Sequence, residues 1–205
     1  MHILKKLKEK FWLQIIIIYT RYLLGGAFVF ASLIKIKGNR FTTTSGADAP
    51  INSAFHFFET MYQSGLYWKF LGLGQLIAGA LLMTQRYSKL GAILNFPVIL
   101  NVFVITLSYD FNYTPVITGT MLLANTILLV WEWNSLRVLV NLPLIPESNN
   151  SLSKLAVWTY TGIILFLFTF GYRLITDHYN MLFWMGVSIV IGLIGFIIGM
   201  RNWVK

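Results

Sequence analysis

The chain has 205 residues, of which 57% are hydrophobic and only 11% are charged. Soluble domains carry roughly 25% charged residues, so this composition excludes a water-soluble fold and leaves no room for a separate soluble catalytic domain. The net charge of +9 comes from basic residues in short segments between apolar runs, a pattern typical of membrane proteins that disfavours nucleic-acid binding. The absence of cysteine excludes thiol chemistry, and three widely spaced histidines predict no metal site.

The apolar runs predict an all-α fold, namely a polytopic membrane helical bundle with about six transmembrane helices. A bilayer core about 30 Å thick needs roughly 20 apolar residues per helix. Six runs have about this length, and their predicted ranges are 11–34, 67–83, 90–107, 116–133, 157–174 and 181–200. Lipid is therefore the first partner that the sequence predicts.

The spacing of these runs divides the chain into three parts. Residues 1–140 predict a four-helix core, 141–156 a cytoplasmic linker, and 157–205 a C-terminal two-helix hairpin. Within the core, 51–63 has apolar residues at helical spacing, with polar residues such as Glu59 on the other face, and is too short to span a bilayer. We expect an amphipathic helix there, on the outer side, that either caps the bundle or gates it.

Basic residues near the helix ends predict the orientation of the bundle. If the N-terminus is inside, ten Lys and Arg side chains lie on the inner side and five on the outer side, with Arg21 within the membrane. Most of the outer charges lie in one long loop, where they influence orientation less. The sequence therefore predicts a multi-pass protein of the cell inner (plasma) membrane with both termini cytoplasmic.

Small residues mark the faces at which helices approach closely in lipid. The first and second runs contain several Gly and Ala residues, and the last run has Gly195 and Gly199 four positions apart. We expect most of these residues to pack within the chain. Gly195 and Gly199 are also candidates for a homodimer contact.

Ionisable residues within membrane spans are costly unless paired, so each is a candidate functional residue. Arg21 lies within the first run, at a depth that matches Glu132 at the end of the fourth, and we expect these two to form a structural ion pair. By the same reasoning Lys35, at the other end of the first run, is matched in depth by Asp110.

Four buried amides lie in the second, third and fourth runs, namely Gln75, Asn95, Asn101 and Asn125. Such amides either join helices by hydrogen bonds or line a pocket for a small lipophilic ligand. None ionises near neutral pH, so none is a convincing general acid or base. No catalytic motif occurs in a supporting context, so the sequence predicts no catalytic residue.

Two stretches resemble the DoxX-like membrane proteins over about residues 11–133. They are Arg21-Tyr22-Leu23-Leu24-Gly25-Gly26 leading to Ile34-Lys35, and Leu71-Gly72-Leu73-Gly74-Gln75-Leu76 leading to Gln85-Arg86. Family members commonly carry Glu where this chain has Gln75. The resemblance implies a four-helix core, and it implies a quinone ligand by analogy with members that are small subunits of quinone-linked oxidoreductase complexes.

These observations favour a non-catalytic membrane component that binds a protein partner or a small lipophilic molecule. The candidate ligand-binding residues are Arg21, Lys35, Gln75, Asn101 and Asp110. The alternative is a quinone-contacting small subunit of a membrane oxidoreductase complex, in which a partner supplies the redox group. A transporter is the second alternative, although the six runs show no clear inverted repeat.

Overall fold

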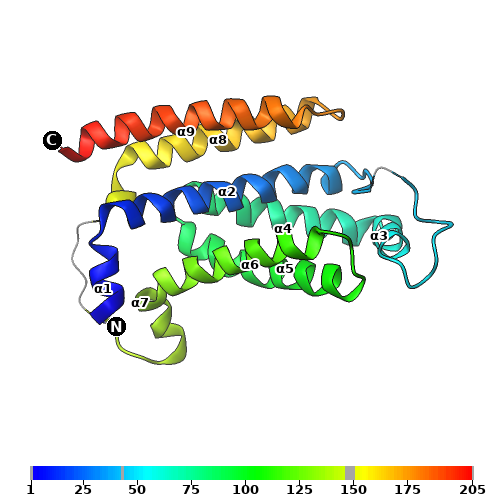
Figure 1. The fold of residues 1–205 in the computed structure, drawn as a ribbon, viewed down its shortest axis with the longest axis horizontal. Coiled ribbons are helices and arrows are strands. Elements are labelled where there is room, and N and C mark those ends of the chain that lie inside the picture. The colour runs from blue at the N-terminus through cyan, green and yellow to red at the C-terminus, as the bar shows by residue number, and fades with distance from the viewer. Residues whose placement is uncertain (1, 43, 146–150, 205) are drawn as a thin grey trace.

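The computed structural model describes residues 2–42, 44–145 and 151–204, and its regular structure there is entirely helical (Figure 1). Six helices are long and apolar enough to cross a membrane, which confirms the predicted all-α bundle of an integral membrane protein. Each predicted range falls on one of these helices, which are α2 (Phe11–Ile36), α4 (Leu66–Met83), α5 (Ser88–Ser108), α6 (Thr114–Trp131), α8 (Ala156–Ile175) and α9 (Met181–Val204).

Shorter helices lie at the two ends of the bundle. The N-terminal α1 (His2–Lys8), α7 (Trp133–Leu136) and the 3₁₀ turns η1 (Arg137–Val140) and η2 (Leu152–Lys154) lie at the end that also holds the C-terminus, here called the terminal end (Figure 1). The opposite end is called the α3 end, because α3 (Ala54–Gln63) lies there. The middle of the predicted linker, 146–150, lies outside the described residues.

The amphipathic helix expected within 51–63 is α3. It begins at Ser53, whose hydroxyl accepts a hydrogen bond from the backbone N–H of His56 at 3.2 Å, an N-cap that satisfies one free donor of the first turn. An N-cap of this kind fixes the point at which the irregular chain after α2 becomes helical.

Helix α2 is the central helix of the bundle, and it packs against α4, α6 and α8. Its contact with α4 depends on small residues, as expected for helices in lipid. A Cβ on Gly25 or on Gly79 would lie 2.7 Å from the other residue's carbonyl oxygen, and a Cβ on Gly72 would lie 2.8 Å from that of Ser32. A side chain at any of these glycines would therefore force the two backbones apart.

The C-terminal hairpin docks on the core through α8. The sequence did not predict whether the last two helices pack on the core. Trp158 is fully buried in one apolar cluster with Tyr22 and Met83, and the Tyr22 hydroxyl donates a hydrogen bond to the Trp158 carbonyl. At the hairpin's start, the backbone N–H of Leu152 donates to Gln14 Oε1 at 2.6 Å. Core and hairpin thus share a buried interface with directed hydrogen bonds.

The glycines of the last helix pack inside this hairpin. A Cβ on Gly195 would overlap Thr161, and a Cβ on Gly199 would overlap the Trp158 ring, both in α8. Packing within the chain therefore accounts for the four-residue spacing of Gly195 and Gly199 that also suggested a homodimer contact.

Gly162 of α8 offers a direct test of hairpin docking. A Cβ there would overlap the Met83 carbonyl oxygen of α4, so Gly162→Ala should destabilise the protein by about 1–3 kcal/mol, as overpacking does elsewhere. We expect a lower melting temperature in detergent for this variant. The matched control is Gly171→Ala in the same helix, where nothing lies within 4 Å of the added methyl. Equal melting temperatures for the two variants would contradict the described docking.

Candidate functional site

A cavity of about 540 Å³ lies at the α3 end of the core, between side chains of α2, α3, α4, α5 and α6. Its lining is mostly apolar, including Phe28, Leu71 and Val102. Three of the five candidate residues line it, each from a different helix, namely Lys35, Gln75 and Asn101. The fold therefore brings together polar residues that lie 66 positions apart in a largely apolar chamber.

Lys35 enters this cavity as a buried cation, and no carboxylate among the described residues pairs with it. Its residue is 8% exposed, and its Nζ donates a hydrogen bond of 3.2 Å to the Ala31 carbonyl one turn earlier. The ammonium lies 5.1 Å from the centre of the Trp68 ring and 5.3 Å from that of Phe41. Aromatic faces stabilise a desolvated cation by about 2 kcal/mol. These two rings therefore provide the stabilisation that an acidic side chain was expected to provide.

The expected pair of Lys35 and Asp110 is wrong. Asp110 follows α5 in the left-handed region of backbone conformation, with φ of 45°, and its side chain is exposed away from the cavity lining. Matching depth therefore did not bring the two residues together. An exposed carboxylate keeps its hydration, whereas pairing with Lys35 would require desolvation.

Three of the four amides expected to be buried are buried, whereas Asn101 is exposed, and the four divide between the two expected roles. Asn95 Nδ2 donates to Asn125 Oδ1 at 3.0 Å, and Asn125 Nδ2 donates to the Ala92 carbonyl at 3.0 Å, so these two join α5 to α6. Gln75 is 6% exposed, and its Oε1 has no hydrogen-bond partner in the described chain. Asn101 is exposed at the cavity wall. Gln75 and Asn101 are therefore available to a ligand.

Helix α3 contributes Phe58 and Met61 to the cavity wall, and an ion pair that the sequence did not predict anchors it. Glu59, expected on the polar face, is 2% exposed. It accepts two hydrogen bonds from Arg40, from Nε at 2.8 Å and from Nη2 at 3.0 Å, and one from the Gly46 backbone N–H at 3.2 Å. The Arg40 guanidinium, with smaller contributions from Gly46 and Gln63, lowers the pKa of Glu59 to about 2.

Arg21 lies in α2, on the terminal-end side of Lys35. The ion pair expected between Arg21 and Glu132 is present. Arg21 Nη2 lies 2.7 Å from Glu132 Oε1, and its Nη1 donates to Gln85 Oε1 at 2.8 Å. Lys89 Nζ lies 3.5 Å from the second Glu132 oxygen. The sequence did not predict the contacts of Gln85, in the turn between α4 and α5, or of Lys89, at the start of α5. Arg21 thus belongs to a network at the terminal end and takes no part in the α3-end cavity.

The sequence did not predict that a third cation, Arg173, is buried. Its guanidinium carbon lies 4.5 Å from the centre of the Phe30 ring and 4.4 Å from that of Tyr179. Nearby, Lys37 Nζ lies 2.8 Å from Asp177 Oδ1 and joins the core to the hairpin. Arg commonly stacks on aromatic rings, but Phe30 is distant from Arg173 in sequence, so no local signal predicted this contact.

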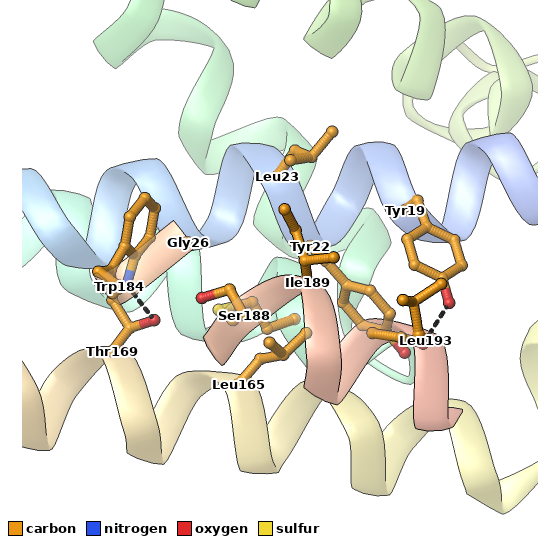
Figure 2. Close-up of a pocket in the computed structure, with 12 residues that line it drawn as sticks. Tyr19, Tyr22, Leu23, Gly26, Leu165, Thr169, Trp184, Ser188, Ile189 and Leu193 are labelled. Atoms are coloured by element: carbon orange, nitrogen blue, oxygen red, sulfur yellow. Dashed lines mark hydrogen bonds between the residues drawn. The ribbon is translucent and has the colours of Figure 1, made fainter. Parts of the chain in front are cut away.

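Another cavity, of about 310 Å³, lies between α2, α8 and α9 (Figure 2). Most of its polar side chains already form hydrogen bonds within the protein. The Tyr19 hydroxyl donates to the backbone carbonyl of Gly192 at 2.7 Å, and Trp184 Nε1 donates to Thr169 Oγ1 at 3.1 Å. Ser188 is an exception, because its hydroxyl has no partner in the described chain. The α3-end cavity therefore offers more recognition chemistry than this one.

No three His, Asp or Glu side chains of residues 2–42, 44–145 and 151–204 gather as metal ligands. In the α3-end cavity, Thr106 and Thr118 bond to each other through their hydroxyls at 2.9 Å. The polar groups that can recognise a ligand there are the Lys35 ammonium, the Gln75 amide and the Asn101 amide. These groups can donate hydrogen bonds to a ligand and, in the two amides, also accept them.

The Arg21–Glu132 pair predicts a coupled loss of stability. Glu132→Gln removes the charge that neutralises a buried guanidinium, which should cost about 3 kcal/mol of unfolding free energy. Arg21→Met combined with Glu132→Gln should recover part of this loss, because the uncompensated charge is also removed. Thermal unfolding of both single variants and the double variant in detergent measures the coupling. Strictly additive losses would show that the pair does not interact energetically.

The Arg40–Glu59 pair predicts acid resistance of the loop before α3. Since the pKa of Glu59 is lowered from 4.5 to about 2, the ionised carboxylate should stabilise the loop fully above pH 4.5, and that stabilisation should be lost as the pH falls through about 2. Pepsin should therefore cleave the loop slowly at pH 4 and rapidly at pH 2, whereas Glu59→Gln should be cleaved rapidly at both. Protection of the variant equal to wild type at pH 4 would refute this anchor.

Comparison with known proteins adds a single uncharacterised relative. No protein-family model matches the chain, and no solved structure matches it significantly. The chain is similar to YwoB, an uncharacterised protein of Bacillus subtilis (strain 168), with 25% identity over 114 residues. These residues make up 55% of this chain and 73% of YwoB. Function must therefore be inferred from the geometry of the site itself.

Proposed function

We propose that this integral membrane protein is a non-catalytic component that binds a small lipophilic molecule in the α3-end cavity. The observation that carries the proposal is a buried ammonium, Lys35, and a buried amide oxygen, on Gln75, that face one apolar chamber without side-chain hydrogen-bond partners. Leaving a buried polar group unsatisfied costs about 1–3 kcal/mol. A bound molecule that supplies the missing partners would recover this cost.

The polar groups define the chemistry of the ligand. The Lys35 ammonium donates only one hydrogen bond in the described chain, so it can donate to a carbonyl or hydroxyl oxygen of a ligand. Gln75 Oε1 accepts from a hydroxyl or N–H group. Phe58, Met61 and Val102 supply apolar and aromatic surface for the rest of the molecule. The matching ligand has an apolar body and a small oxygen-bearing head, which fits a cavity within the bilayer.

A quinone is the second candidate and a specific member of this class. Its two carbonyl oxygens accept hydrogen bonds in the oxidised form and its hydroxyls donate them in the reduced form, so Lys35 and Gln75 suit either state. The DoxX-like resemblance, which stays a prediction, favours the same ligand. In this version the chain is a small subunit that positions the quinone, and a partner membrane protein exchanges electrons with it.

The orientation predicted from sequence places this cavity in the outer half of the bilayer. Both termini lie at one end of the bundle (Figure 1), and the excess of basic residues on that side favours the cytoplasm. The α3 end then faces outward. We propose that a ligand enters from the outer leaflet, beside the Arg40–Glu59 anchor that holds α3.

Native mass spectrometry of the protein in lipid nanodiscs tests the proposal. The wild type should retain a lipophilic molecule other than bulk phospholipid after purification. Lys35→Met and Gln75→Leu should each reduce its occupancy roughly ten-fold or more, because a hydrogen bond to a buried group is lost. Identification of a quinone would favour the second candidate over other lipophilic ligands.

Two variants serve as matched controls. Lys69→Met removes an exposed cation at the same end of the bundle, and Gly74→Ala alters the neighbour of Gln75 where nothing lies within 4 Å of an added methyl. Neither residue lines the cavity, so both variants should retain the ligand. Only bulk phospholipid in every sample, or equal loss in the controls, would contradict a ligand site at Lys35 and Gln75.

A further inference from the structure

A second cavity, of about 720 Å³, lies at the terminal end of the bundle, far along α2 from the proposed ligand site. It is formed by residues of α1, α2, the turn between α4 and α5, the end of α6, and the start of the hairpin. Its lining is strongly basic, with six cations and one carboxylate, which are Lys5, Lys8, Arg21, Arg86, Lys89, Lys154 and Glu132.

The single carboxylate is already neutralised from within the protein. Glu132 Oε1 lies 2.7 Å from Arg21, and Glu132 Oε2 lies 3.5 Å from Lys89. Lys5 and Arg86 have no acidic partner within the described part of the chain, and both side chains are exposed. Lys5 and Arg86 are therefore two cations at this cavity that no described carboxylate neutralises.

The buried residues of this cavity are joined by hydrogen bonds, which distinguishes it from a scatter of basic loop residues. Arg21 is buried and bonded to Gln85 Oε1 at 2.8 Å, and Gln85 Nε2 donates to the Ile18 carbonyl at 3.4 Å. The buried Ser88 hydroxyl donates to the Gln85 carbonyl at 2.9 Å. The positive-inside rule requires basic residues on one side of the membrane, but it does not require segments far apart in sequence to direct them into one chamber.

We propose that this terminal-end cavity is a binding site for a phosphate group, and that the phosphate belongs to an anionic phospholipid of the adjacent leaflet. Arg and Lys bind phosphate oxygens through charge-assisted hydrogen bonds, and basic pockets between transmembrane helices on the cytoplasmic side hold lipid headgroups. Lys5 and Arg86 contact the phosphate, while the Arg21–Glu132 pair forms the floor.

The depth of the cavity favours a lipid over a soluble anion. Arg21 lies within α2, and apolar or aromatic residues, namely Trp131, Ala156 and Tyr160, line the cavity beside the cations. Tyr160 and Ala156 are exposed on the hairpin surface, where an acyl chain can lie along α8 while the headgroup enters the cavity. A free phosphate would use the cations but gain nothing from this apolar wall.

Nanodiscs of phosphatidylcholine and phosphatidylglycerol at a ratio of four to one test the proposal. Native mass spectrometry should detect one phosphatidylglycerol retained by the wild type after the bulk lipid is stripped. Lys5→Gln and Arg86→Gln should each lower its occupancy roughly five-fold, as expected for one cation near an anionic headgroup. Lys5→Arg and Arg86→Lys should keep it, which separates charge from folding.

Arg201→Gln is the matched control, because Arg201 is an exposed cation at the terminal end of α9 that does not line the cavity. It should retain phosphatidylglycerol like the wild type. A second arm adds inorganic phosphate to protein in pure phosphatidylcholine nanodiscs and measures the melting temperature. Stabilisation of the wild type but not of Arg86→Gln, without lipid retention, would assign the site to free phosphate.

Two outcomes would overturn the proposal. One is the absence of both lipid retention and phosphate stabilisation in the wild type. The other is a loss in Arg201→Gln equal to that in Arg86→Gln, which would show general attraction of a basic surface for anionic lipid. Neither outcome bears on the α3-end cavity, since Lys35 and Gln75 lie outside this site, so the two proposals fail independently.

Discussion

The central constraint on this protein is that α2 buries two cations, and the rest of the bundle is arranged around them. Arg21 is 3% exposed near one end of the helix and Lys35 is 8% exposed near the other. A charge within a bilayer is costly unless it has partners. Arg21 obtains a carboxylate from the end of α6 and an amide from the α4–α5 turn. Lys35 obtains the faces of two aromatic rings and one carbonyl.

These two solutions give the ends of the bundle different chemistry. At the terminal end, the Arg21–Glu132 pair is complete, and the surrounding cations form a basic cavity above it. At the α3 end, Lys35 pairs with no carboxylate of the described chain and faces an apolar cavity beside Gln75. Between them, Gly25 and Gly79 hold α2 against α4 at a separation that only glycine allows. The tight contact between α2 and α4 thus separates two cavities, each of which contains a cation of α2 and has space for a ligand.

The sequence predicted the six spans and the Arg21–Glu132 pair, because helix length and membrane depth follow directly from apolar runs. It also placed Lys35 and Gln75 among the candidate residues. It did not predict which residues share a cavity, since depth gives no information on the rotation of each helix. For that reason Asp110 was wrongly matched to Lys35, and Glu59 was assigned to a polar face although it is buried. Gln85 gave no signal in sequence because its burial depends on a left-handed turn with φ of 58°.

The central claim is that Lys35 and Gln75 contact a lipophilic molecule. Nuclear magnetic resonance of ¹⁵N-labelled side chains tests it directly, with spectra of protein stripped of lipophilic molecules and then supplied with a membrane lipid extract. The account predicts that the Lys35 and Gln75 signals move on addition of the extract, while those of the internally bonded Asn95 and Asn125 stay fixed. Unchanged Lys35 and Gln75 signals would contradict it.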